Sequence, residues 1–371
     1  MNDFGRLLRT AARVSRTRYP AFIFGMPLKR AEIPVFIYHD VETASFARDL
    51  EFLSSNGYRT LSLGEYLAAR ESKSRADKRV LLTFDDARKS FWHVAMPLLR
   101  TFDARAVLFA PSYWMADPAE RAPDDLFMTW EQLRACAESG LVDVQSHAHR
   151  HAIVPISPRL VDFANPQALG RFDVYDWPLR TIGGAEELGM PAPGTPVYRS
   201  APLLSASRRY VENGELTQLC REFVASNGGE EFFSRPTWRA ELQKFYAERS
   251  RTMPGRFMDD ATFERLVASE FELNREAFVK HLGYAPLCIA YPWMLGSQLS
   301  LKLARHSGLR AAFGVAMYYR AERRNGRMPL PVFGRLKCDW LQFLPGERRL
   351  SVFDAVSRKV SGFTKVQHLA H

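Results

Sequence analysis

Hydrophobic and polar positions alternate along residues 31–151 in a way that predicts parallel strands joined by helices. Short apolar runs rich in β-branched and aromatic residues, such as PVFIY (34–38) and RVLLTF (79–84), are followed by longer stretches with apolar residues at helical spacing. RAVLFA (105–110) and LVDVQS (141–146) are further runs of this kind. Strands that alternate with helices form parallel sheets, because each helix returns the chain to the start of the next strand. The pattern predicts an α/β fold, and a single barrel with insertions fits the 371 residues as well as two domains would.

This alternation stops after His151. Residues 152–261 are rich in Pro and Gly and have no regular period, apart from helical patterns in ENGELTQLCREFVAS (212–226) and TWRAELQKFYAER (237–249). A long helical pattern from residue 262 restores the alternation, so we expect an α/β fold of parallel strands that is interrupted by a large irregular insertion. The expected organisation is a basic N-terminal arm (1–30), a first part of the barrel (31–151), the insertion (152–261), a second part of the barrel (262–345) and a basic C-terminal tail (346–371).

The net charge of +10 on these 371 residues is concentrated at the two ends of the chain. Residues 1–30 carry +6 and residues 346–371 carry +3, which leaves only +1 for residues 31–345. A nearly neutral body gives no support for a general affinity for nucleic acid. We therefore expect no nucleic-acid partner.

The N-terminal arm has two interpretations. Arg6, Arg9, Arg13 and Arg16 recur at helical spacing among apolar residues, and the apolar stretch YPAFIFGMPL (19–28) follows. This is typical of a helix that lies on an anionic membrane surface, but an arm docked on the barrel with its arginines in solvent has the same pattern. The arm lacks the apolar core and cleavage site of a secretory signal, and the four cysteines form no C-x-x-C pair. We expect a cytoplasmic protein, at the inner face of the membrane if the arm binds lipid.

Unusual residues follow several of the predicted strands. In barrels of parallel strands, reactive groups collect at the carboxyl ends of the strands, because the loops there converge. The residues at these ends are His39, Asp85 and Asp86, the histidines 147, 149 and 151, and Tyr291, Pro292 and Trp293.

Two of these groups suggest a bound metal ion. Adjacent carboxylates such as Asp85 and Asp86 resist joint ionisation when they are buried, and a cation relieves that cost, although a helix N-cap with an acidic neighbour has the same sequence. Imidazole is a common zinc ligand. In an extended segment His147, His149 and His151 face the same way, whereas in a helical turn only His147 and His151 do. The spacing leaves both arrangements open.

The motifs TFDD (83–86) and SHAHRH (146–151) together resemble the first two motifs of the polysaccharide deacetylase family, with NodB homology, also called carbohydrate esterase family 4. The resemblance covers about residues 31–151 and 262–320. It implies a distorted barrel that binds a divalent metal, usually zinc. The ligands that it implies are Asp86, His147 and His151, with His149 at a variable position.

The resemblance also implies catalytic roles. Asp85 corresponds to the general base, and the backbone N–H near Trp293, in the Tyr291-Pro292-Trp293 segment, serves the oxyanion. In most members the general acid is a histidine on a C-terminal L-x-H strand, but we find no strand of that kind after residue 330, and His368 lies in a polar tail. The early FIYHD (36–40) resembles the permuted branch of the family, which makes His39 the expected acid.

Several positions depart from the family pattern. Ala87 replaces a frequent Gly after the aspartate pair, and Ala148 replaces the Ser or Thr after the first histidine, so a loop hydrogen bond that orients the ligands is missing. The segment around Pro292 lacks the arginine of the third motif. Candidates for an arginine that acts on Asp85 are Arg88, Arg199 and Arg335.

The expected function is a metal-dependent hydrolase that removes an N-acyl group, acetyl by expectation, from an amino sugar of a saccharide or lipid-linked saccharide. Two alternatives remain open. One is a degenerate saccharide-binding barrel in a polysaccharide assembly pathway, and the other is a metal-free glycosidase that uses Asp85. The expected partners are a carbohydrate substrate and a membrane surface at the basic termini. Aromatic residues of the insertion that can stack on sugar rings are Phe172, Tyr175, Trp177, Tyr198 and Tyr210.

Overall fold

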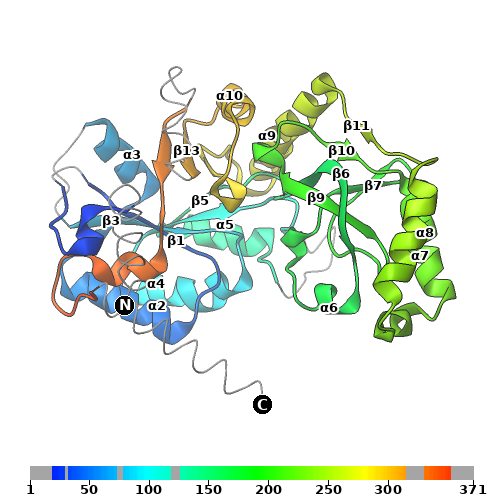
Figure 1. Ribbon diagram of the computed structural model, residues 1–371. Helices are drawn as coiled ribbons and strands as arrows, with labels where there is room; N and C mark the ends of the chain where they lie inside the picture. Colours follow the sequence, from blue (N-terminus) through cyan, green and yellow to red (C-terminus); the bar gives the residue numbers. More distant parts are fainter. Residues whose placement is uncertain (1–18, 30–31, 73–77, 118–125, 315–329, 352–371) are drawn as a thin grey trace, which may run out of the picture.

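A computed structural model describes residues 19–29, 32–72, 78–117, 126–314 and 330–351. The two parts of the predicted barrel come together and confirm the expected fold, a nearly closed barrel of parallel strands (Figure 1). The insertion forms a lobe at one side of this barrel. In spatial order the barrel strands are β14 (Val332–Gly334), β13 (Ala311–Gly314), β12 (Cys288–Ala290), β5 (Val142–Ser146), β4 (Ala106–Ala110), β3 (Arg79–Phe84), β1 (Val35–Tyr38) and β15 (Leu336–Lys337), and β2 (Arg59–Thr60) also pairs with β3.

A single short segment closes the barrel. Strands β14 and β15 lie at the two edges of the sheet, yet only Arg335 separates them in the sequence. β14 pairs with β13 through Phe313 and Phe333, and β15 pairs with β1 through Phe36 and Leu336. The sequence pattern did not reveal these two short strands, and neither of them carries an L-x-H motif.

The central barrel strands are rich in apolar residues, and both of their faces are buried. In β4 every residue is buried, and in β3 only Arg79 is partly exposed. Such strands are stabilised by burial against side chains inside the barrel and helices outside it. Helices follow the strands, and Ser62 and Thr129 each form a capping box at the start of one of them. These helices are α2 (Thr43–Ser55), α3 (Leu63–Glu71), α4 (Met96–Thr101), α5 (Trp130–Glu138), α9 (Asp260–Leu282) and α10 (Gln298–His306).

The insertion is more regular than its Pro and Gly content suggested. Both helices expected there are present, as α7 (Gly214–Ser226) and α8 (Trp238–Ser250). They pack beside the long antiparallel pair β6 (Ile153–Phe163) and β9 (Pro196–Pro202), over an apolar cluster of their own that includes Phe232. The smaller elements are α6 (Pro166–Leu169), a 3-10 turn η3 (Val174–Asp176), and the antiparallel pairs β7 (Arg180–Ile182) with β8 (Ala185–Glu187) and β10 (Tyr210–Val211) with β11 (Arg256–Phe257).

The described part of the N-terminal arm packs on the barrel. Phe22 and Ile23, in the 3-10 turn η1 (Ala21–Phe24), are buried in the main core cluster. Arg349 donates to the carbonyl of Phe22 at 2.8 Å. The arginines at positions 6–16, and most of the C-terminal tail, lie outside the described residues. Among the helices that the structure describes, none is long and apolar enough to cross a membrane.

Candidate metal and active site

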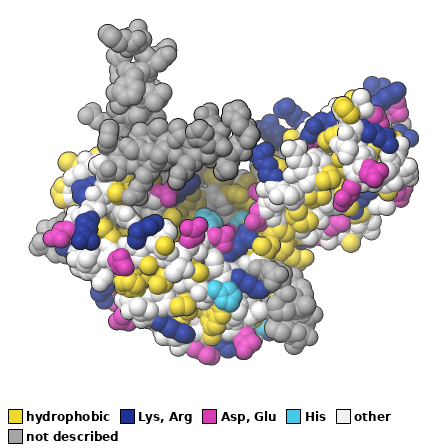
Figure 2. Space-filling model, turned by 90° about the horizontal axis from the view of Figure 1, so that it is seen from below, with side chains coloured by type: hydrophobic (Ala, Val, Ile, Leu, Met, Phe, Trp, Pro, Cys, Tyr) yellow, Lys and Arg dark blue, Asp and Glu magenta, His cyan; other side chains and the backbone are white. Residues whose placement is uncertain are grey.

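The strand ends bring the predicted residues to one end of the barrel. Asp85 and Asp86 follow β3, and His147 follows β5, two strands away in the sheet. His151 comes four residues later, in the loop before β6. All four side chains are almost completely buried, with 1 to 6% of each residue exposed. Histidine side chains lie within a hollow of the molecular surface in Figure 2.

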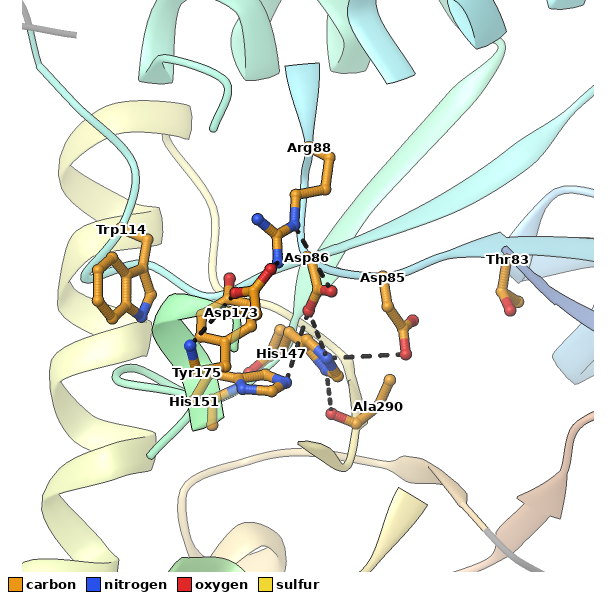
Figure 3. Close-up of polar contacts among 12 residues, drawn as sticks. Thr83, Asp85, Asp86, Arg88, Trp114, His147, His151, Asp173, Tyr175 and Ala290 are labelled. Carbon is orange, nitrogen blue, oxygen red and sulfur yellow. Dashed lines mark hydrogen bonds and ion pairs between the residues drawn. The ribbon is translucent and has the colours of Figure 1, made fainter. Parts of the chain in front are cut away.

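Asp86, His147 and His151 form a cluster whose geometry suits a metal ion. The Oδ1 atom of Asp86 lies 3.4 Å from Nε2 of His147 and 3.5 Å from Nε2 of His151 (Figure 3). Ligand atoms about 2.0–2.1 Å from a tetrahedral zinc ion are about 3.3 Å from one another. Among the residues that the structure describes, these three are the only group of at least three His, Cys, Asp or Glu placed to share an ion.

The orientation of His147 and the ionisation of His151 and Asp86 also fit metal binding. Burial opposes protonation of His147, but Asp85 and Asp86 raise its pKa above the ordinary value, so an ion at this site would have to displace a proton from this ring. The Nδ1 atom of His147 lies 2.7 Å from the carbonyl oxygen of Ala290, so Nδ1–H donates there and Nε2 faces Asp86. Burial lowers the pKa of His151 to about 3, which keeps this ring neutral. Burial alone would raise the pKa of Asp86, but His147 and His151 hold it below its ordinary value. A carboxylate and a neutral imidazole are the forms that bind zinc.

Asp85 has a different partner, Arg335. The guanidinium donates to both carboxylate oxygens, at 2.6 Å and 2.8 Å, in a bidentate pair that is buried on both sides. Burial opposes ionisation, but the charge of Arg335 keeps the pKa of Asp85 below its ordinary value. Of the other two candidate arginines, Arg88 pairs with Asp173 and Arg199 is exposed on β9. Of the three candidate arginines, Arg335 is thus the one that pairs with Asp85.

His39 leaves the barrel beside Asp85. Strands β1 and β3 pair with Tyr38 opposite Phe84, and the N–H of Asp85 donates to the carbonyl of Tyr38 at 2.9 Å. The next residue of each strand therefore emerges at the same point of the rim. Unlike the aspartates, His39 is exposed to solvent, so a substrate can reach it.

Of the Tyr291-Pro292-Trp293 segment, only Trp293 faces the site. Tyr291 is fully buried in an apolar cluster, and its N–H donates to the carbonyl of Phe313 at 3.0 Å. Pro292 is also buried and has no N–H. The side chain of Tyr291 is therefore enclosed within the protein. The Trp293 ring lies 4.3 Å from that of His151.

Backbone strain is concentrated around these residues. Nine described residues other than glycine have a positive φ, and six of them belong to the site: Asp86, Ala87, Ala148, His151, Trp293 and Met294. Such conformations cost about 1–3 kcal/mol each and persist where the surroundings enforce them. The φ of 47° at Ala87 also explains why this position often carries glycine.

Two side chains of α9 hold the histidine loop, and the sequence analysis missed both. Glu270, 1% exposed, accepts from the N–H groups of His149 and Arg150 at 3.2 Å and 2.8 Å. Asn274 donates to the carbonyl of Ala148 at 2.7 Å. These bonds hold the loop although Ala148 lacks the expected hydroxyl. A signal was available, because Glu270 and Asn274 are polar residues one helical turn apart on the otherwise apolar face of α9.

His149 points away from the metal cluster. Its Nδ1 lies 2.9 Å from Oγ of Ser112, and its ring packs edge-on against Tyr113. Burial lowers the pKa of His149 to about 4. The loop between His147 and His151 turns rather than extends, as the family resemblance implied.

Most of the insertion's aromatic side chains support the structure rather than line a surface. Only Phe172, 47% exposed, is open to solvent among the five that sequence analysis proposed for sugar stacking. The other four are at most 7% exposed: Tyr175, Trp177, Tyr198 and Tyr210.

Comparison with known proteins agrees with this site. The sequence pattern of the family described as polysaccharide deacetylase matches residues 72–190, which include both the aspartate pair and the histidine loop. Residues 72–190 therefore resemble a NodB-type polysaccharide deacetylase domain.

Similarity to individual deacetylases is confined to part of the chain. The poly-β-1,6-N-acetyl-D-glucosamine N-deacetylase of Escherichia coli (strain K12) is 34% identical over 119 residues, 30% of this chain and 18% of that protein. The polysaccharide deacetylase YxkH, as it is named, of Bacillus subtilis (strain 168) is 26% identical over 132 residues, 33% of this chain and 44% of that protein. The matches thus span less than half the length of these relatives.

Solved deacetylase structures share the fold over most of this chain. The deacetylase domain of BpsB from Bordetella bronchiseptica superposes with a TM-score of 0.51, 18% identity, and coverage of 84% of this chain and 98% of that domain. A de-N-acetylase from Aggregatibacter actinomycetemcomitans gives a TM-score of 0.50, 18% identity, and coverage of 82% and 94%. At this identity the likeness concerns the fold alone.

The first prediction separates metal ligands from the neighbouring histidine. Asp86→Ala, His147→Ala and His151→Ala should each lose bound zinc, whereas His149→Ala should retain it, because only the first three lie in the cluster. The measurement is zinc content after dialysis against a weak chelator. Thermal unfolding of each variant with excess chelator controls for folding. Loss of zinc in His149→Ala together with its retention in Asp86→Ala would contradict the assignment.

The second prediction concerns the Asp85–Arg335 pair. Arg335→Met leaves a buried, unpaired carboxylate, so the free energy of unfolding should fall by about 3–5 kcal/mol at pH 7. Arg335 lowers the folded-state pKa of Asp85, so the pair stabilises the fold above the unfolded pKa of roughly 3.9 and this contribution is lost as the pH falls through the folded pKa. The decrease in the free energy of unfolding caused by Arg335→Met should therefore be smaller in acid than at pH 7, as measured by denaturant unfolding of the metal-free protein.

The control for this prediction is a double-mutant cycle with Asp85→Asn. The two single substitutions and the double variant give the coupling energy at pH 7. A coupling energy near zero would show that Arg335 stabilises the barrel through its packing and not through Asp85.

Proposed function

We propose that this chain is a metal-dependent N-deacetylase that hydrolyses the acetamido group of an amino sugar in a saccharide. The observation that carries the proposal is the convergence of Asp86, His147 and His151 beside the carboxylate of Asp85, at one end of the barrel. The match of residues 72–190 to the polysaccharide deacetylase family supports it.

A divalent ion held by Asp86, His147 and His151, most suitably zinc, would polarise the amide carbonyl and lower the pKa of a water molecule. Asp85 takes the proton from the attacking water. It is ionised because Arg335 lowers its pKa, and its oxygens keep lone pairs beyond the two that accept from Arg335. The bidentate pair also fixes the orientation of the carboxylate, so Asp85 meets the water in one position.

The leaving amine requires a proton when the C–N bond breaks. His39 stands at the end of β1, beside Asp85, and is exposed to solvent. In our proposal the imidazolium of His39 gives its proton to the amine nitrogen, while the water oxygen becomes part of the released acetate. The backbone next to Trp293, held at a φ of 51°, is proposed to face the oxyanion.

The proposed substrate is a polymer or lipid-linked saccharide of N-acetylglucosamine units. The Escherichia coli relative is named for a β-1,6-linked polymer of this sugar, and the match to it includes 30% of this chain. The exposed ring of Phe172, next to Asp173 in the insertion, supports a sugar-binding role for that side of the site.

The test of this function uses acetate release from N-acetylated glucosamine oligosaccharides by zinc-loaded protein. Asp85→Asn and His39→Ala should keep wild-type zinc content and lose roughly 100-fold or more in kcat, because each removes a general acid or base. His149→Ala serves as the control and should keep most of the activity.

Each alternative gives a different result in the same assay. Binding of oligosaccharides without any acetate release by the wild-type protein would favour a non-catalytic saccharide-binding barrel. Release of new reducing ends by metal-free protein would favour a glycosidase. Loss of zinc in His39→Ala would show that this histidine is a ligand and not the acid.

A further inference from the structure

The insertion contacts the metal cluster directly, and we propose that Tyr175 is a positioning residue for the metal ligand His151, held in place by an ion pair between Asp173 and Arg88. This inference rests on the proposed metal site but not on the identity of the substrate. It gives the 152–261 segment a role in building the site, in addition to any role in binding saccharide.

The two histidine ligands are oriented by different means. A metal-binding histidine usually donates its second ring N–H to a protein oxygen, which fixes the ring. His147 does so, through the carbonyl of Ala290 at 2.7 Å. The Nδ1 atom of His151 is buried and has no hydrogen-bond partner in any other residue that the structure describes. The orientation of the His151 ring must therefore come from packing.

Aromatic rings supply that packing. The centroid of the Tyr175 ring lies 4.0 Å from that of His151, with 30° between the ring planes, and the Trp293 ring lies at 4.3 Å. Tyr175 comes from the insertion and Trp293 from the loop after β12. A ring held by two aromatic neighbours has few orientations open to it, so these contacts keep Nε2 of His151 directed towards Asp86 (Figure 3).

Tyr175 is in turn held by the residues around the short turn η3. Asp173 accepts from the N–H of Tyr175 at 3.2 Å through one carboxylate oxygen. Its other oxygen accepts from Arg88 at 2.8 Å. The Arg88 guanidinium also lies over the rings of Tyr175 and Phe127, at 5.0 Å and 4.7 Å from their centroids. Arg88 thus contacts both the turn η3, through Asp173, and the ring of Tyr175.

Arg88 also contacts a second proposed metal ligand, Asp86. It lies two residues after Asp86, is 7% exposed, and places Nε 3.9 Å from Oδ2 of Asp86. The contacts form a closed path from Asp86 through Arg88, Asp173 and Tyr175 to His151. Asp86 and His151 lie in loops that follow different strands. Contacts with the insertion therefore fix the position of these two proposed ligands relative to each other.

The experiment measures Co²⁺ binding to the full chain, with the visible absorption of the bound ion as a report of its coordination geometry. Tyr175→Leu removes the ring and should weaken Co²⁺ binding about 10- to 100-fold with an altered spectrum, the range expected for residues that orient ligands. Tyr175→Phe keeps the ring and should restore both affinity and spectrum. Asp173→Asn should also weaken Co²⁺ binding.

Asp162→Asn is the matched control, since Asp162 makes a bidentate ion pair with Arg239 elsewhere in the same insertion. It should leave the affinity and the spectrum at wild-type values. The effect of Asp173→Asn should largely disappear in the Tyr175→Leu background, because both act through one ring. Unfolding of each metal-free variant shows whether the fold is kept.

Wild-type affinity and spectrum in Tyr175→Leu would overturn the inference, and so would equal effects of Asp173→Asn and Asp162→Asn. A wild-type protein that binds Co²⁺ at this site but deacetylates no saccharide would contradict the proposed function and leave this inference standing. A wild-type protein whose Co²⁺ binding is unchanged by Asp86→Ala would contradict both.

Discussion

Two neighbouring carboxylates buried at one end of a barrel need positive partners, because like charges repel strongly where water does not screen them. The barrel supplies a different partner to each. Asp85 receives the guanidinium of Arg335 on both oxygens, and Asp86 faces two imidazole Nε2 atoms spaced as metal ligands. The two aspartates therefore have different chemical environments, since Asp85 is paired with an arginine and Asp86 is placed to bind an ion.

The partner of Asp85 also links the site to the closure of the barrel. Arg335 lies between the two short strands that join the edges of the sheet, so the residue that completes the fold is the one that fixes the proposed base. The histidine loop depends in a similar way on distant elements. Glu270 and Asn274 hold it from α9, and Tyr175 packs on it from the insertion.

Features that depend on the local pattern of residues could be predicted from the sequence. The apolar runs before Asp85 and His147 are strands, the long helix and both helices of the insertion are present, and the aspartate and histidine motifs meet. Local pattern could not choose the arginine for Asp85, because Arg335 is 250 residues away. Nor could it reveal strands of three and two residues, which are too short to show a period. The burial of Tyr291 likewise depends on neighbours that only the folded chain brings together.

The most direct test of this account is a crystal structure of the zinc-loaded protein with anomalous scattering measured at the zinc edge. The account predicts one strong peak, bonded to a carboxylate oxygen of Asp86 and to Nε2 of His147 and His151 at about 2.0–2.2 Å, with Asp85 still paired to Arg335. A peak bonded to His149 or His39, or no peak in this hollow at saturating zinc, would contradict it.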